Sequence, residues 1–188
     1  MRARTLFVGA APGAVVVATT LVQEHLSARS ASGIVISEYR FRGPKGDNDE
    51  FIELFNAGSA PVNVGGWLVR VSANNIPTSL ATRATIPPNT VIPAGCYFLV
   101  ANATTTTGFV GPGRPTPNLT YTTNGFGDEG GVAIATGLTV ASIVDQVGQG
   151  TAPNAYGEGL RLTPANLPPG VVLTTNVERG IERRPGVN

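Results

Sequence analysis

Short apolar segments, each about the length of a β-strand, recur along the chain from Gly33 onward. They are rich in β-branched and aromatic residues and are separated by glycine, proline, asparagine and threonine, which is typical of strands joined by turns. No segment carries the i, i+3, i+4, i+7 apolar stripe of a core helix. The pattern predicts an all-β, antiparallel sandwich or barrel with strands at Ile34–Phe41, Glu50–Phe55, Trp67–Ala73, Cys96–Asn102, Gly131–Thr136 and Ser142–Gly148.

Alternation with a period of two predicts which side chains share a face of each strand. In the second strand, Ile52 and Leu54 are expected on one face, opposite Phe51, Glu53 and Phe55. In the first strand, strict alternation predicts two faces, with Ile34, Ile36, Glu38 and Arg40 on one and Val35, Ser37, Tyr39 and Phe41 on the other.

Two further stretches read as extended connections. Ala103–Asn118 contains five threonines and three prolines, and proline cannot donate to a strand ladder, so we expect a long surface loop or an edge. Thr163–Gly170 is a second connection of this kind. Neither stretch is long or repetitive enough to link two domains, so the sequence predicts a single domain.

The segment Gly43–Glu50, GPKGDNDE, places three carboxylates and an amide between the first two strands. These side chains are hard oxygen ligands of the kind that calcium prefers, but their spacing is not that of an EF-hand loop. Calcium needs six or more oxygens, and four adjacent side chains cannot all point inward. Gly-Pro and Gly-Asp favour a hairpin turn instead. We therefore assign no metal, cofactor or catalytic residue, and calcium binding by Asp47, Asp49 and Glu50 stays open.

Glu38 and Glu53 interrupt apolar strands and are the other candidates for chemistry. A carboxylate pair could perform general acid–base catalysis. The alternative is that each accepts hydrogen bonds from a loop backbone or from an arginine at the sheet edge. We favour the structural alternative, because the sequence shows no nucleophile beside them.

Composition narrows the possible functions. The hydrophobic fraction of 41% supports a core, while a net charge of +1 disfavours a nucleic-acid surface. Cys96 is the only cysteine, so an intrachain disulfide cannot form, and its apolar surroundings predict a small buried side chain. His25 is the only histidine.

The first 30 residues resemble a secretory signal peptide. Arg2 and Arg4 precede an uncharged run over Thr5–Val22, and Ala28-Arg29-Ser30 offers a small-x-small cleavage site. An uncleaved anchor and a docked N-terminal helix are the alternatives. Removal of this leader would take His25 with it, which would exclude histidine-based catalysis and histidine-ligated zinc from the mature chain.

Several motifs together carry a family resemblance. They are the segments Ile36–Glu38, Glu50–Asn56, Pro61–Trp67, Ile92–Val100, Asp128–Ile134 and Ile143–Gly150, followed by YGEGLRL and ERGIERRPG. In this order they are similar to the lamin tail domain family in its bacterial exported form. The resemblance implies an immunoglobulin-like antiparallel β-sandwich over residues 33–188. It also implies structural roles for Asn56 at a turn, Trp67 in the core, and Gly66 and Gly95 at bends.

The resemblance implies a non-catalytic, secreted or cell-surface binding or structural module without cofactors. The expected partner is an unidentified protein, glycan or cell-surface ligand. DNA is possible within the family but is not supported by the charge, and no integral membrane span is expected in the mature chain. The alternatives are a truncated targeting module of an extracellular hydrolase, such as a nuclease or phosphoesterase, or a metal-dependent hydrolase.

Overall fold

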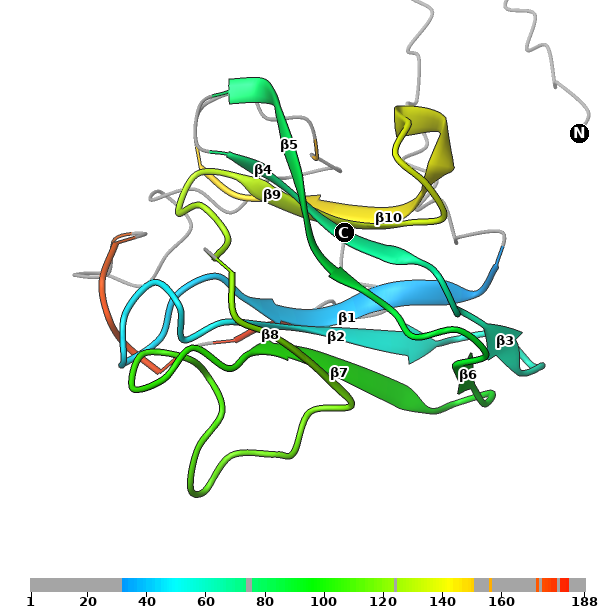
Figure 1. Ribbon diagram of the computed structural model, residues 1–188, viewed down its shortest axis with the longest axis horizontal. Coiled ribbons are helices and arrows are strands. Elements are labelled where there is room, and N and C mark those ends of the chain that lie inside the picture. The colour runs from blue at the N-terminus through cyan, green and yellow to red at the C-terminus, as the bar shows by residue number, and fades with distance from the viewer. Residues whose placement is uncertain are drawn as a thin grey trace, which may run out of the picture.

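The computed structural model describes residues 32–73, 76–123, 125–150, 156, 172, 174–178 and 180–182 (Figure 1). The expected signal segment 1–30, with His25, and the expected connection Thr163–Gly170 lie outside the described residues. Within the described part of the chain, no helix is long and apolar enough to cross a membrane.

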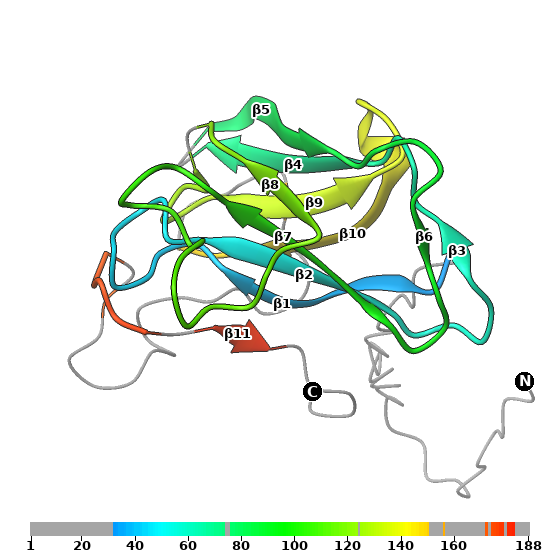
Figure 2. The ribbon, with the colours of Figure 1, turned by 60° about the horizontal axis from the view of Figure 1, so that its bottom comes forward.

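Two sheets stack to form a sandwich (Figures 1 and 2). The first sheet has the strand order β11-β1-β2-β7-β8, in which only the β7–β8 pair is parallel. Its strands are β1 (Ile34–Arg40), β2 (Phe51–Asn56), β7 (Tyr97–Asn102), β8 (Leu119–Tyr121) and β11 (Ile181–Glu182).

The second sheet has four antiparallel strands in the order β10-β9-β4-β5. A short third sheet, β3-β6, lies at one end. The remaining elements are β3 (Val62–Asn63), β4 (Leu68–Ala73), β5 (Ile76–Thr85), β6 (Val91–Ile92), β9 (Gly131–Ala135), the 3-10 turn η1 (Val140–Ser142) and β10 (Ile143–Gly148). All six predicted strands are present with their ends shifted by at most one residue, which confirms the all-β prediction.

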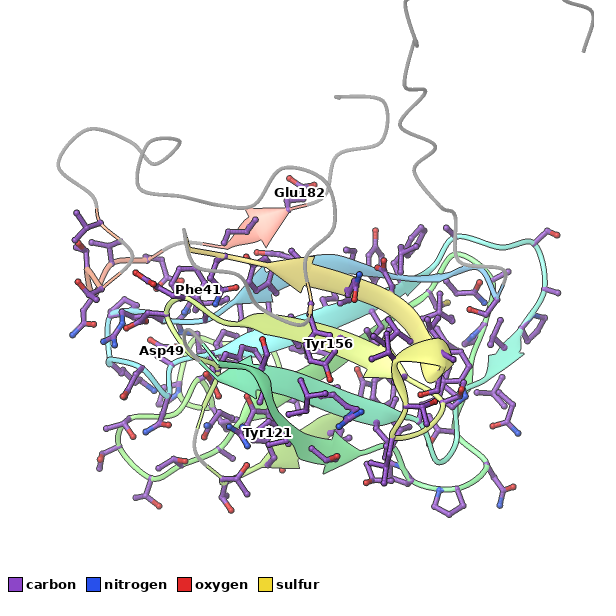
Figure 3. All side chains as sticks on the ribbon, turned by 90° about the horizontal axis from the view of Figure 1, so that it is seen from above. Phe41, Asp49, Tyr121, Tyr156 and Glu182 are labelled. Carbon is purple, nitrogen blue, oxygen red and sulfur yellow. The ribbon has the colours of Figure 1, made fainter. Side chains whose placement is uncertain are left out.

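The core lies between the two large sheets. The alternation predicted for β2 is confirmed, because Ile52 and Leu54 are fully buried among core side chains. Val69 of β4 and Ile134 of β9 face them from the second sheet and are also fully buried. On the outer side of the second sheet, buried Tyr156 lies over the strands (Figure 3).

The strict alternation expected for β1 is wrong beyond Ile36. The register between β1 and β2 shifts between Ile36 and Glu38, so that Ser37 is an extra residue in a β-bulge. The extra residue reverses the alternation of side chains in the rest of β1. Tyr39 and Phe41 therefore join Ile36 in the core, while Glu38 and Arg40 lie on the outer face.

The prediction of a buried Cys96 is also wrong, because its side chain is exposed. Cys96 closes a turn in which its amide donates to the carbonyl of Pro93 at 3.1 Å, and the preceding Gly95 has a φ of 71°. The strand β7 begins only at the next residue. The apolar run CYFLV thus starts in the turn, outside the pleated part of the strand.

The turn role implied for Asn56 is confirmed. This fully buried side chain donates to the carbonyls of Ala60 and Ile92, both at 2.9 Å, and accepts from the amide of Gly58 at 3.0 Å. It therefore joins the end of β2 to its own turn and to β6. Trp67 packs against the core but is only partly buried.

Candidate functional site

The carboxyl group of Glu50 is fully buried immediately before β2. Its Oε1 accepts hydrogen bonds from the Tyr121 hydroxyl at 2.5 Å and from the Asn102 amide at 3.1 Å. Its Oε2 accepts the backbone amide of Phe126 at 2.6 Å. One side chain therefore joins β2, the end of β7, β8 and the segment that leads to β9 in the opposite sheet.

Burial raises the pKa of Glu50 to about 7. The hydrogen bonds from Tyr121, Phe126 and Asn102 oppose this shift, as does the positive charge of Arg83. Burial, together with the nearby Glu50 carboxylate, also raises the pKa of Tyr121 well above its ordinary value. Glu50 is therefore a buried acid whose pKa lies near neutral pH.

The backbone also fits closely around this acid. A Cβ added to Gly125 would overlap the carboxylate of Glu50, so any larger residue here would force the carboxylate or the backbone to move. The carbonyl of Gly125 accepts a hydrogen bond from Arg83 Nε at 3.1 Å. Because Arg83 lies on β5, this bond adds a second link between the site and the four-stranded sheet.

Asp49, the neighbouring buried carboxylate, belongs to a different group of contacts. It accepts from Arg40 Nη1 at 3.0 Å and from the Lys45 backbone amide at 3.1 Å, and Arg114 Nη2 lies 3.6 Å away. Glu178 forms ion pairs with both arginines. These contacts hold the β1–β2 turn, the long loop and the 174–178 segment together at one end of the sandwich (Figure 3).

The two arginines also stack on aromatic rings. The guanidinium of Arg40 lies 5.3 Å from the ring centre of Phe51 and 5.4 Å from that of Phe109. The guanidinium of Arg114 lies 5.1 Å from the ring centre of Phe109. Because Phe109 belongs to the predicted loop Ala103–Asn118, this stack fixes the loop against the outer face of the five-stranded sheet.

The acids of the Gly43–Glu50 segment do not converge. Asp49 and Glu50 direct their carboxylates into the two separate groups of contacts above, while Asp47 is exposed. Asn48 donates to the hydroxyl of Thr107 at 3.3 Å. Gly43 and Gly46 exchange backbone hydrogen bonds, so the segment forms the expected turn. Among the residues that the structure describes, no three His, Cys, Asp or Glu side chains form a group that could hold a metal.

Glu38 and Glu53 are brought together as directly opposed residues of β1 and β2. Glu53 Oε1 accepts a hydrogen bond from the Ser37 hydroxyl at 2.8 Å, a donor that neither alternative had named. Burial raises the pKa of Glu38, followed by the charges of Glu53 and Glu182, while Arg40 lowers it. Glu38 and Glu53 thus place two carboxyl groups side by side on the outer face of the five-stranded sheet.

Two structural acids were missed by the sequence reasoning. Asp145 of β10 accepts a hydrogen bond from the backbone amide of Ile36 of β1 at 2.6 Å, and thereby joins one sheet to the other. Asp128 accepts two hydrogen bonds from Arg42, both at 2.8 Å. The only signal for these roles was their place within the family-like segments Asp128–Ile134 and Ile143–Gly150.

Comparison with known proteins identifies the family to which this fold and the Glu50 contacts belong. No curated protein matches the chain. Among protein families, the Lamin Tail Domain matches residues 27–151, which include the strands β1 to β10 and the Glu50 group of contacts. Since this match spans more than half of the sequence, the chain belongs to the Lamin Tail Domain family.

Proposed function

We propose that the protein is an exported, non-catalytic binding module whose loops and exposed sheet face recognise a partner. The proposal rests on the leader-like residues 1–30 and on the family membership. A fold of this kind carries many functions, so the role must be argued from the side chains.

The observation that carries the proposal is the use made of the buried carboxylates. Asp49, Glu50 and Asp145 each accept hydrogen bonds from backbone or side-chain donors that hold strands and loops in place. An acid used in this way stabilises the fold, because breaking its bonds leaves a buried charge without partners. These side chains are therefore scaffold, and recognition is left to the exposed residues.

Export is tested by expressing the full chain with its own leader in a bacterial host and fractionating the culture. We expect the protein outside the cytoplasm, with an intact mass that corresponds to cleavage near Ala28–Ala31. Replacement of Arg2 and Arg4 by glutamate should block export. Retention of the full-length wild-type chain in the cytoplasm would contradict the proposal.

The absence of catalysis is tested on the exported protein with plasmid DNA and a chromogenic phosphodiester, each with added calcium or magnesium. We expect no turnover above the rate without protein. A turnover that is lost in Glu38→Gln or Glu53→Gln, with the melting temperature unchanged, would show that the opposed carboxylates are catalytic.

A further inference from the structure

The outer face of the five-stranded sheet has two ends, and the protein fills one of them with its own arginines. There Arg40 of β1 lies opposite Phe51 of β2. Its guanidinium stacks on Phe51 and Phe109 and pairs with Asp49. The end is closed, because Arg40 is only 4% exposed. Aromatic rings beside a carboxylate are thus the chemistry by which this face already binds guanidinium groups.

The other end of the same face carries an aromatic pair of which one ring is exposed and the other is partly buried. Phe55 of β2 lies opposite Tyr97 of β7 and Val35 of β1. The ring centres of Phe55 and Tyr97 are 4.7 Å apart, and Tyr97 is 58% exposed. Phe55 is only partly buried, so the exposed Tyr97 ring, supported by Phe55, offers a flat surface on which a planar group can stack.

Carboxylates lie next to this aromatic pair. Glu53 is two residues from Phe55 on β2 and faces the same side of the sheet, about 7 Å away along the strand. It is also a diagonal neighbour of Tyr97, at the roughly 7–8 Å that long side chains can bridge. Glu38 lies opposite Glu53, and burial, followed by repulsion from the Glu53 carboxylate, raises the pKa of Glu38.

We propose that this open end, formed by Phe55 and Tyr97 with Glu53 and Glu38, docks arginine side chains of an extended segment of a partner protein. The inference rests on the proposed binding function and names the partner class for it. One guanidinium stacks on the Tyr97 ring while it pairs with Glu53, in the way that Arg40 contacts Phe51 and Asp49.

Charge complementarity selects this partner over others. The opposed carboxylates repel a polyanion such as DNA and gain little from a neutral glycan, whereas a cation relieves their mutual repulsion. Arginine is favoured over lysine, because its planar group both stacks on a ring and pairs with a carboxylate. In an extended peptide, side chains on one face recur every two residues, which matches the spacing between the aromatic and acidic rows.

The test uses the full chain as the host exports it and three fluorescent nine-residue peptides, in which arginine, lysine or glutamate alternates with serine. Binding is followed by fluorescence anisotropy at low and high salt. We expect the arginine peptide to bind at least threefold more tightly than the lysine peptide, and the glutamate peptide not to bind. Tyr97→Ala and Glu53→Gln should each weaken arginine-peptide binding by fivefold or more.

Leu138→Ala and Asp47→Asn are the matched controls, because they remove an exposed apolar side chain and an exposed carboxylate elsewhere. Both should bind the arginine peptide as the wild type does. Glutamine at position 53 can still accept the Ser37 hydroxyl, so this variant should keep its melting temperature. Glu38→Gln provides a second acidic variant with the same expected loss.

The inference is overturned if the arginine and lysine peptides bind equally, or if Tyr97→Ala and Glu53→Gln bind like the controls. An exported protein that ignores the arginine peptide but binds a glycan or a cell surface also overturns it, while the proposed function stands. Retention of the chain in the cytoplasm contradicts the proposed function instead, whether or not the arginine peptide binds.

Discussion

The backbone amide of Ile36 donates to the carboxylate of Asp145 at 2.6 Å, and this hydrogen bond links β1 of one sheet to β10 of the other. The bond lies just before the β-bulge at Ser37, and among the described residues β11 pairs with β1 at Glu38 and Tyr39. The Asp145 side chain thus takes the place of a neighbouring strand for this amide.

Replacing Asp145 by alanine should lower the free energy of unfolding by about 1–3 kcal/mol, because the buried amide of Ile36 loses its acceptor. Asp145→Asn keeps an oxygen acceptor and should cost less. Urea unfolding followed by circular dichroism measures both. Asp47→Ala removes an exposed carboxylate and is the control; an equal loss in the control would mean that the bond to Ile36 is not the cause.

The pKa of Glu50 predicts a pH dependence of stability. Its pKa is raised from 4.5 in the unfolded chain to about 7 in the folded protein, so the folded state binds the proton more tightly. The resulting stabilisation is fully present below pH 4.5 and is lost as the pH rises through about 7, by at most about 3 kcal/mol. Unfolding by urea at several pH values between 4 and 9 measures it.

Glu50→Gln is the variant that isolates this effect. Glutamine has no proton to exchange, so the fall in stability between pH 4.5 and 7 should become smaller. Its amide group also faces donors such as Tyr121, so we expect a lower stability at acidic pH. A wild-type protein whose stability rises over this pH range would show that another group dominates.

Gly125→Ala should destabilise the fold by about 1–3 kcal/mol, because the added methyl group overlaps the buried Glu50 carboxylate. Thermal unfolding measures the change. Gly137→Ala is the matched control, since a Cβ there meets only ordinary contacts at 3.5 Å from Ser142. Equal melting temperatures for the two variants would mean that the loop around Gly125 yields without cost.

Calcium should leave the melting temperature unchanged, because the carboxylates of Asp49 and Glu50 are engaged by other donors. A ligand that binds the native state would raise the melting temperature. The measurement is a thermal unfolding curve at increasing calcium concentration, with magnesium as the comparison. A shift with calcium that disappears in Asp47→Asn would restore the cation site that the sequence left open.

The pKa of Glu38 should fall in Glu53→Gln, because the neighbouring negative charge contributes to its upward shift. An NMR pH titration of the Glu38 carboxyl carbon measures this in both proteins. Asp128→Asn, which changes a carboxylate bound to Arg42, should leave the Glu38 titration unchanged.

The strand positions could be predicted from the sequence because apolar alternation and turn residues are local signals. β2 follows its alternation, and Ile52 and Leu54 are buried as expected. The faces of β1 were predicted wrongly past Ile36, because no residue type near Ser37 indicates a β-bulge. β5 was missed because Ile76–Thr85 contains a proline and many small polar residues, and only its pairing with β4 makes it a strand.

The Glu50 group could not be predicted at all. Its donors Asn102, Tyr121 and Phe126 lie 52 to 76 residues away along the chain. In the sequence, Glu50 follows other acidic residues in a predicted turn, where an exposed side chain is expected. Only the stacking of the two sheets buries it. The same holds for Asp145, which is 109 residues from Ile36.

The exposed thiol of Cys96 precedes Tyr97 directly and is the only cysteine of the chain. A maleimide dye attached there would stand at the margin of the open aromatic end and would report on its occupancy by a change in emission. Amine-reactive dyes are the poorer choice, because the one lysine, Lys45, donates its ammonium hydrogens to the carbonyls of Gly108 and Val110. Coupling at that amine would disturb the long loop, whereas coupling at the thiol leaves it intact.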